Sequence, residues 1–403
     1  MLGSKIVALK KRDGFEAKNS IVSTPAVYES TRSTLIVVST HDGQVIAFDS
    51  QLKKLWSYTV RTELSKEEEF FFDEEKANMV TESPRLADIN NDGYPEVIFG
   101  ATNGLLYALD SRGKELWKFK CGDSVKATPL VADIDSDSRM EIVFPSRDGV
   151  VHFLDSGGRE LRSFKADSKI ECSPELLRRR SDTCIVFGSD DGTFYAVSSL
   201  AQEIWRHDAS SRIRAQPAVG NLFGDGKPHV VFGTEKGALI VLTAHGSRVW
   251  SYKAEGAILA KPCLADINKD GRLEVLFGSC DDSLYALSSS GSRLWRFHTN
   301  FWIGSTPLVI DLERNPKILV GSYDGVLYLL DAAGSLHLNY LPGMSGFLQQ
   351  AGHYTDLLTG DVGSYEGKEI CSLKLGSMIT GTTSVKSMFV VSTKDGVNEV
   401  VLA

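Results

Sequence analysis

The chain has 403 residues, of which 42% are hydrophobic, and this supplies enough apolar material for a large core. The formal net charge is −8 and the Lys and Arg residues are scattered, which argues against partners such as nucleic acid or an anionic membrane surface. No apolar run approaches the roughly 18 residues that a transmembrane helix requires. Because a strand begins near Lys5, the chain is expected to be cytoplasmic as it stands, or periplasmic or extracellular if a leader has been removed.

In chain order, the predicted elements repeat one unit of four strands. An isolated outer strand comes first, and the unit is clearest in the second copy, where Pro84 opens strand A over residues 85–88. A polar loop leads to strand B over 96–100, a tight turn leads to strand C over 105–110, and strand D ends at Phe119. The opening proline recurs about every 45 residues after the first interval, at Pro25, Pro84, Pro129, Pro174, Pro217, Pro262 and Pro307.

A tight turn joins strands B and C in each copy, and most of these turns contain Asp-Gly. Asp-Gly between two apolar runs is a strong hairpin signal, because a type I′ turn needs positive φ at both central residues. The turns are Thr40–Gly43, Thr102–Gly104, Ser146–Gly149, Ser189–Gly192, Thr234–Gly237, Ser279–Ser283, Ser322–Gly325 and Ser392–Gly396. We refer to them as the DG turns. Short strands repeating at this period predict an all-β fold, a single β-propeller domain spanning residues 1–403.

The number of turns predicts eight blades, each a four-stranded antiparallel sheet. The eighth copy is split, because residues 383–403 resemble strands A, B and C while the first residues resemble an outer strand. Pairing the N- and C-terminal strands in one blade would close the ring and remove an open sheet edge.

One large aromatic residue marks strand D in most copies. Trp56, Trp117, Trp205, Trp250 and Trp295 share this position, and we expect each to pack into the seam with the neighbouring blade. The third copy has Arg162 instead, and the seventh has His337 nearby.

With these features in place, the chain resembles two propeller families. Residues 108–119, ALDSRGKELWKF, are similar to the Trp-docking motif of PQQ-like repeats, and residues 86–100, LADINNDGYPEVIFG, are similar to FG-GAP or VCBS-type repeats. The resemblance covers nearly the whole chain and implies an eight-bladed propeller. It implies no single function, because these families include quinoprotein dehydrogenases, assembly scaffolds and many binding proteins.

Three A-to-B loops carry oxygen donors at positions 1, 3, 5 and 9. Such spacing can wrap hard oxygen ligands around Ca²⁺, with Gly at position 6 allowing the sharp bend. We expect the metal more strongly in the first and third loops than in the second, where Ser138 replaces Gly. Asp and Asn also cap turn amides without a metal, so this second reading stays open. The candidate ligands are Asp88, Asn90, Asp92 and Glu96, then Asp133, Asp135, Asp137 and Glu141, then Asp266, Asn268, Asp270 and Glu274.

Two long insertions interrupt the repeat, at about 61–80 and 339–378, and we expect both in D-to-A connections on the face that carries the DG turns. The first contains Phe70, Phe71 and Phe72, which form either a clip over the channel or a partner-binding motif. The residues ahead of each strand A are expected to line the mouth of the channel on this face. These residues, Glu82, Lys126, Glu171, Arg214 and Lys261, with Trp302 close by, suit a polar ligand or peptide and equally a ring of ion pairs.

The sequence therefore favours a monomeric, non-catalytic scaffold that binds a protein or peptide on the loop-bearing face, with A-to-B loops held by Ca²⁺. The alternative is a propeller enzyme that uses the channel, either a hydrolase or lyase or, less favoured, a quinoprotein dehydrogenase. PQQ is not expected, since the vicinal cysteine pair of many such enzymes is absent. The histidines are dispersed and no HExxH or Ser-His-Asp pattern is visible, so no catalytic residue is assigned.

Overall fold

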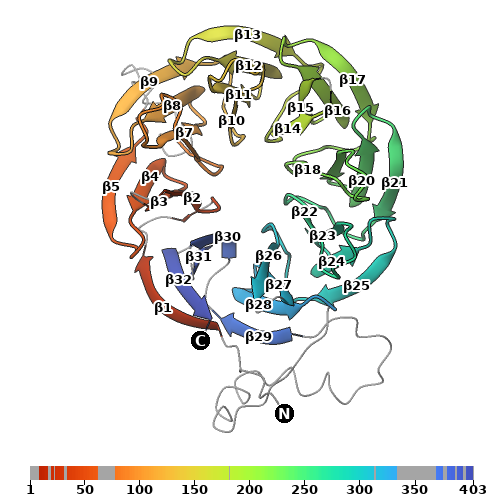
Figure 1. The fold of residues 1–403 in the computed structure, drawn as a ribbon. Coiled ribbons are helices and arrows are strands. Elements are labelled where there is room, and N and C mark those ends of the chain that lie inside the picture. The colour runs from red at the N-terminus through yellow and green to blue at the C-terminus, as the bar shows by residue number, and fades with distance from the viewer. Residues whose placement is uncertain are drawn as a thin grey trace, which may run out of the picture.

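The computed structural model describes residues 9–16, 20–21, 23–30, 34–61, 78–180, 182–312, 315–333, 369–374, 379–385, 388–393 and 396–402. For residues 9–16, Leu312 and the strands after residue 368, only the backbone is described. Every regular element in this part of the chain is a β-strand, and the strands form antiparallel four-stranded sheets arranged around a common centre (Figure 1). The all-β propeller expected from the repeat is confirmed.

In each of the first three sheets, the chain runs from the innermost strand to the outermost. The first sheet holds β2 (Ala26–Glu29), β3 (Thr34–Ser39), β4 (Gln44–Phe48) and β5 (Lys54–Thr59). The second holds β6 (Arg85–Ala87), β7 (Glu96–Gly100), β8 (Leu105–Leu109) and β9 (Glu115–Lys120). The third holds β10 (Leu130–Ala132), β11 (Glu141–Pro145), β12 (Val150–Leu154) and β13 (Glu160–Lys165).

The next three sheets repeat this order. The fourth holds β14 (Glu175–Arg178), β15 (Thr183–Gly188), β16 (Thr193–Ser198) and β17 (Glu203–Asp208). The fifth holds β18 (Ala218–Gly220), β19 (His229–Gly233), β20 (Ala238–Thr243) and β21 (Arg248–Lys253). The sixth holds β22 (Cys263–Ala265), β23 (Glu274–Ser279), β24 (Ser283–Leu287) and β25 (Arg293–His298).

The remaining strands depart from this continuity. The seventh sheet combines β26 (Leu308–Leu312), β27 (Asn315–Gly321) and β28 (Val326–Asp331) with β29 (Glu369–Lys374). A further sheet has the order β1-β32-β31-β30, from β1 (Leu9–Glu16), β32 (Gly396–Leu402), β31 (Met388–Thr393) and β30 (Ile379–Val385). Its outermost strand comes from the beginning of the chain.

The position of β29 corrects one expectation about the second insertion. Because β29 pairs with β28, the long connection over residues 334–368 joins strand C to strand D and is not a D-to-A connection. Strand C ends, and strand D begins, on the face opposite the DG turns. The residue at the Trp position of β29 is Cys371, opposite Leu329, whereas His337 lies outside the described residues. The sequence lacked the tryptophan that marks strand D, and the strand was therefore missed.

The tryptophans lock neighbouring sheets together, as expected. Each indole Nε1 donates to a backbone carbonyl in the C-to-D turn of the next sheet, for instance from Trp117 to Ser156 at 3.0 Å. The turn glycine is required at this contact, because Gly158 has a left-handed φ of 80° and a Cβ there would lie 2.6 Å from the Trp117 ring. The other contacts join Trp56 to Ser111, Trp205 to Ala244, Trp250 to Ser289 and Trp295 to Ala332.

The core lies between adjacent sheets and is built from a repeated aromatic cluster. In the second sheet Phe99 and Tyr107 stack with their centroids 5.2 Å apart, and Tyr58 from the preceding outer strand meets Phe99 at 64°. Phe187 with Tyr195 and Phe277 with Tyr285 repeat the stack. Large rings buried in this way supply much of the apolar area that holds one blade to the next.

Candidate binding site at the channel mouth

The DG turns and the D-to-A connections lie on the same face and surround the entrance to the central channel. In six of the DG turns the backbone N–H of the second residue donates to the connection that enters its own sheet, for example Arg147 to the Ser124 carbonyl at 2.8 Å and Tyr323 to the Trp302 carbonyl at 2.9 Å. In the turn Thr102–Gly104 the N–H of Thr102 donates in the same way to the Met79 carbonyl. These bonds fix the turns and connections to one another. We call this rim the mouth, and its side chains are therefore presented by a rigid backbone.

One arc of the mouth, over the third to fifth sheets, carries an ion-pair network. The Glu171 carboxylate lies 2.9 Å from Arg147 Nε, 3.4 Å from Lys126 Nζ and 3.4 Å from Arg214 Nε. Arg214 Nε is also 3.2 Å from Glu235 and 3.6 Å from Asp190. Sequence reasoning named Lys126, Glu171 and Arg214 but missed the three partners, which lie in the DG turns. We call these residues the charged arc.

Glu82 lies apart from that network. Its side chain is exposed by surface area, yet the channel wall surrounds it, and no described residue forms a hydrogen bond or ion pair with its carboxylate. This enclosure, together with the charge of Glu171, raises the pKa of Glu82 to about 7. The same position holds only small residues in the other described copies, namely Ser23, Ala127, Cys172, Ala215, Ala260 and Ser305.

A second arc of the mouth is aromatic. Phe301 and Trp302 are 47% and 44% exposed, and their rings stack with centroids 5.4 Å apart and planes at 18°. Both residues lie in the connection between β25 and β26. Leu259 is exposed in the preceding connection. We call Phe301 and Trp302 the aromatic platform.

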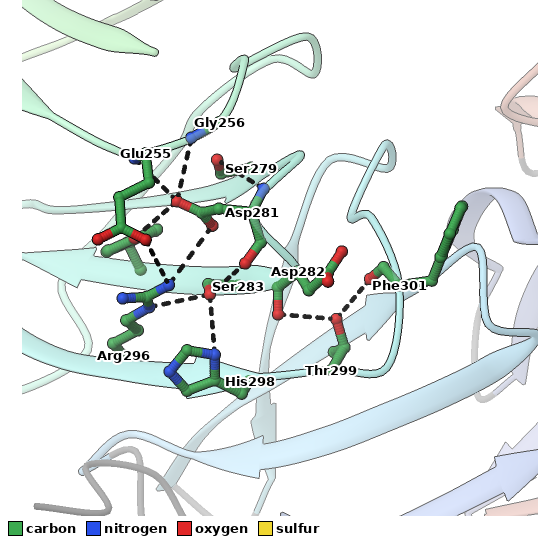
Figure 2. A network of polar contacts seen from close by, with 11 residues as sticks. Glu255, Gly256, Ser279, Asp281, Asp282, Ser283, Arg296, His298, Thr299 and Phe301 are labelled. Atoms are coloured by element: carbon green, nitrogen blue, oxygen red, sulfur yellow. Dashed lines mark hydrogen bonds and ion pairs between the residues drawn. The ribbon is translucent and has the colours of Figure 1, made fainter.

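Hydrogen bonds from the sixth DG turn hold the platform's backbone in place. Figure 2 shows Thr299 between Asp282 and Phe301: its hydroxyl contacts the Asp282 carbonyl at 3.1 Å and the Phe301 carbonyl at 2.6 Å. The Thr299 N–H also donates to Asp282, whose φ of 62° takes the place of the usual turn glycine. The aromatic pair is thus exposed on an ordered segment rather than on a loose loop.

The same network anchors the turn to the neighbouring connection. The Asp281 carboxylate accepts hydrogen bonds from the Tyr285 hydroxyl at 2.8 Å and from the backbone N–H groups of Glu255 and Gly256 (Figure 2). Arg296 lies over the Tyr285 ring, 5.2 Å from its centroid, and donates to Ser283. The network therefore supports the platform and leaves the rings free.

Deeper in the channel, polar groups meet an otherwise apolar wall. A cavity of about 310 Å³ is lined by Glu175, Ala218, Val219, Lys261, Pro262, Cys263, Leu264 and Thr306. Glu175 accepts from Lys261 and, at 3.2 Å, from the Gln216 amide. Lys261, which sequence reasoning placed at the mouth, is thus engaged inside the channel. Glu175 and Arg85 were missed, although charged side chains at the start of strand A break the apolar pattern of the other copies.

The three A-to-B loops have one backbone conformation. Their fourth residues, Asn91, Ser136 and Lys269, have φ between 60° and 68°. Ser138 has φ of 67°, so it takes up the left-handed conformation of Gly93 and Gly271. The replacement of Gly by Ser therefore does not alter the course of the second loop.

The donor sets of the loops differ at position 3. In the first loop, the Asn90 amide donates to Asp92 at 3.2 Å and to Glu96 at 3.0 Å, and Asn268 does the same in the third loop. The second loop has Asp135 instead, and oxygens of Asp133, Asp135 and Glu141 lie within 4.8 Å of one another. Burial, followed by the nearby carboxylates, raises the pKa of Glu141. The second loop thus brings three carboxylates together, a donor set that fits a hard cation, with the Arg162 guanidinium 3.6 Å from Asp135.

One arrangement of catalytic appearance was not foreseen from sequence. Ser146 Oγ lies 3.2 Å from His152 Nε2, and His152 Nδ1 lies 2.8 Å from Glu160. Ser146 is 0% exposed, however, and its hydroxyl also contacts Asp148. His152 stacks on Phe144 at the position that tyrosine occupies in other sheets. We interpret this as blade packing, because substrate has no access to the hydroxyl.

One further expectation cannot be placed at the mouth. Phe70, Phe71 and Phe72 lie outside the described residues. The described cysteines, Cys121, Cys172, Cys184, Cys263 and Cys280, are free thiols, and burial raises the pKa of Cys172 to about 12. Within the described part of the chain, no helix is long and apolar enough to cross a bilayer.

The radial sheets and their central cavity define the chain as a β-propeller. A family model described as the lambda-carrageenase beta-propeller domain matches residues 35–132 and 229–340, just over half of the sequence. The chain belongs to this family. This match confirms the propeller fold that the sequence resemblance implied. A search of curated proteins found no match to the sequence.

Solved structures share the fold at low sequence identity. BamB from Moraxella catarrhalis is 17% identical with a TM-score of 0.66, covering 97% of this chain and 99% of that chain. A europium-containing methanol dehydrogenase is 13% identical with a TM-score of 0.66, covering 97% of this chain and 85% of that one. BBS1N, solved in complex with ARL6DN, is 11% identical with a TM-score of 0.53, and the match covers 79% of this chain and 91% of that chain. These similar structures include an enzyme and a protein bound to a partner, so the shared fold does not indicate which function this chain has.

Proposed function

We propose that the chain is a non-catalytic, monomeric propeller that captures a peptide segment of a partner protein at the mouth. The observation that carries the proposal is the aromatic platform, because Trp and Phe stacked and exposed on a fixed backbone are typical anchors of binding surfaces. The charged arc adds fixed Arg and Lys groups on the same rim. A peptide with an apolar side chain and mixed charges would match both.

The ion pairs of the charged arc favour a peptide ligand over an acidic polymer. The cations Lys126, Arg147 and Arg214 all contact Glu171, so little positive charge is left unpaired in this arc. A strongly anionic chain would gain most from unpaired cations. The match to a carrageenase family nevertheless makes a polysaccharide the competing ligand to test.

Peptides selected from a random display library against the intact protein test the proposal. We expect Trp302→Ala and Phe301→Ala to weaken the selected peptides at least tenfold, roughly the loss of one interface anchor. Leu200→Ala is the matched control, because Leu200 is 62% exposed but lies in a C-to-D turn on the opposite face. The measurement is calorimetric titration of each variant.

Two outcomes would count against this function. Selected peptides that bind Trp302→Ala as tightly as the original chain would place recognition elsewhere. Carrageenan oligosaccharides that bind at Trp302 while no peptide is enriched would replace the peptide with a glycan.

We also propose that Ca²⁺ binds the second A-to-B loop, through Asp133, Asp135, Asp137 and Glu141. The FG-GAP-like sequence supports a metal, and the convergent carboxylates support this loop over the other two. Bound Ca²⁺ would fix the loop by linking its donors. No reaction is assigned to the ion.

A matched exchange at position 3 separates metal binding from turn capping. Asp135→Asn gives the second loop the donors of the first, and we expect it to abolish a Ca²⁺-dependent rise in melting temperature. Asn90→Asp makes the reverse change and should add a Ca²⁺ site. At a Ca²⁺ concentration 100 times Kd, the gain is about 2.7 kcal/mol. If millimolar Ca²⁺ leaves the unfolding temperature unchanged, the loops are capped turns only.

Finally, we propose that the ring has eight blades and is closed by both ends of the chain. The pairing of β1 with β32, from Leu9 with Leu402 to Glu16 with Gly396, supports this closure. The position of β30 on the inner side, between β26 and β2, supports it as well (Figure 1).

A further inference from the structure

DG turns flank the aromatic platform on both sides, and each connects an aspartate to the segment that carries the rings. At the sixth turn, the Thr299 hydroxyl joins the Asp282 carbonyl to the Phe301 carbonyl (Figure 2). At the seventh turn, the Asp324 carboxylate accepts from the Asn300 N–H at 3.1 Å. Both aspartates are therefore hydrogen-bonded to the residues that directly precede Phe301.

Neither aspartate has a cationic partner among the described residues. The Asp324 carboxylate accepts from neutral groups, namely backbone N–H groups and the Tyr328 hydroxyl at 2.8 Å. One carboxylate oxygen of Asp282 is buried and has no hydrogen-bond partner among these residues. Neutral donors leave the charge of a carboxylate in place, so both turns present negative charge beside the platform.

The described lysine and arginine side chains near the platform are Lys261 and Arg296, and both have carboxylate partners. Arg296 lies 3.8 Å from Glu255, and Lys261 is bonded to Glu175 inside the channel. His298 adds little positive charge, because burial, followed by the charge of Arg296, lowers its pKa. Among the described residues, these cations are thus engaged away from the two aspartates.

The described charges in this part of the mouth leave an excess of negative charge. Lys261 and Glu175 cancel, which leaves Arg296 against the carboxylates of Glu255, Asp281, Asp282 and Asp324. Burial, and after it nearby charges that include Glu82, raises the pKa of Tyr323 in the seventh turn, so Glu82 adds to the excess when it is ionised. The formal net charge of the whole chain, −8, has the same sign.

The platform itself attracts positive charge. The face of an aromatic ring carries negative electrostatic potential and binds cations, and Trp does so most strongly. Trp302 and Phe301 are 44% and 47% exposed, so ring area is available for such a contact. The carboxylates of the adjacent turns strengthen the attraction for a cation and repel a carboxylate or sulfate group. Ring chemistry and charge therefore favour the same kind of side chain.

We propose that the platform binds an arginine or lysine side chain of the partner peptide, with the apolar stem against the rings and the charge facing the carboxylates of the sixth and seventh turns. This inference rests on the proposed function and specifies the anchor residue of the peptide. A basic side chain supplies an apolar surface together with a positive charge, which the platform and its two turns complement.

A blocked tripeptide with a central arginine, compared with the same tripeptide carrying citrulline, tests the charge of the anchor. Citrulline has nearly the same shape as arginine and is neutral. The protein is labelled with 5-fluorotryptophan, and the Trp302 signal is identified in fluorine NMR by its loss in Trp302→Phe. We expect the arginine probe to shift this signal and to bind roughly threefold or more tightly than the citrulline probe.

Asp324→Asn removes one negative charge from the seventh turn and keeps the turn intact. The second DG turn already holds Asn103 at this position, where its amide donates to the Tyr107 hydroxyl at 2.8 Å. We expect the variant to bind the arginine probe roughly twofold more weakly and the citrulline probe unchanged. Asp191→Asn is the matched control, because Asp191 holds this position in the fourth sheet, across the ring from the platform (Figure 1). It should leave both probes unchanged.

The outcomes separate this inference from the proposed function. A Trp302 signal that responds equally to arginine and citrulline, or a stronger response to a tripeptide with central aspartate, would overturn the basic anchor. If display-selected peptides still require Trp302 in that case, peptide capture at the mouth stands without it. Selected peptides that ignore Trp302 would overturn the proposed function, and the basic anchor with it.

Discussion

At the scale of single residues, the mouth carries a large charged side chain at a position where the other described copies of the repeat have small side chains. Glu82 is the clearest case, because the equivalent residues are Ser, Ala or Cys. A carboxylate there gains no hydrogen bond from a described residue, and it faces the charge of Glu171. Its ionised form is therefore disfavoured in the folded protein.

Glu82→Gln should make stability less sensitive to pH. The folded pKa of about 7 lies above the ordinary value of 4.5, so the contribution of Glu82 is fully present below pH 4.5 and is lost as pH rises through 7. We expect the variant to match the original chain at pH 4.5 and to exceed it at pH 8 by about 1 kcal/mol, discounted for screening by channel water. Urea unfolding of both proteins across this range measures the difference.

Because the two proteins share every other carboxyl group, the difference between their unfolding free energies reports on position 82 alone. A difference that does not change with pH would show that Glu82 ionises normally in the folded protein. A variant that is less stable at pH 8 would show that the carboxylate has a stabilising partner.

Single residues were also where sequence reasoning was least complete. Lys126, Glu171 and Arg214 could be placed at the mouth because each lies ahead of a strand A. Arg147, Asp190 and Glu235 could not be linked to them, since these residues belong to turns that the repeat presents as scaffold. Which groups meet across the ring depends on side-chain reach, and spacing along the chain does not reveal it.

At the scale of elements, the repeat was predicted well wherever its markers were present. The second copy was expected over 85–88, 96–100 and 105–110, and the structure has β6, β7 and β8 at nearly the same residues. The failure came at β29, where no tryptophan identifies the outer strand and a long insertion precedes it. The prediction of a D-to-A insertion there was wrong because local pattern carries no information on long-range pairing.

The Trp contact with the turn glycine also explains why both residues are replaced together in the third and fourth sheets. Arg162 replaces the tryptophan of β13, and the matching turn position in the next sheet is Ala201, with φ of 59°, instead of glycine. Without an indole to accommodate, the turn tolerates a Cβ. Arg162 instead lies 6.0 Å from the Phe153 ring centroid and 3.6 Å from Asp135.

Restoring the contact requires both changes. Arg162→Trp alone should be destabilising by about 1–3 kcal/mol, because the Ala201 Cβ would meet the indole as a Cβ on Gly158 would meet Trp117. Adding Ala201→Gly should recover at least about 1 kcal/mol of this loss. A double-mutant cycle measured by chemical denaturation gives the coupling, and additive effects would show that the two positions do not meet.

At the scale of the whole molecule, the sheet β1-β32-β31-β30 decides whether the propeller is a closed ring. If β1 completes this sheet, removing residues 1–16 exposes the β32 edge, whose backbone groups then lack partners. We expect the shortened chain to melt at a lower temperature and to self-associate. A synthetic peptide of residues 1–18 should reverse both effects, and hydrogen exchange should show renewed protection of the β32 amides. A shortened chain that stays monomeric with an unchanged melting temperature would mean that β1 contributes nothing to closure, and the ring would then be held by its inner contacts alone.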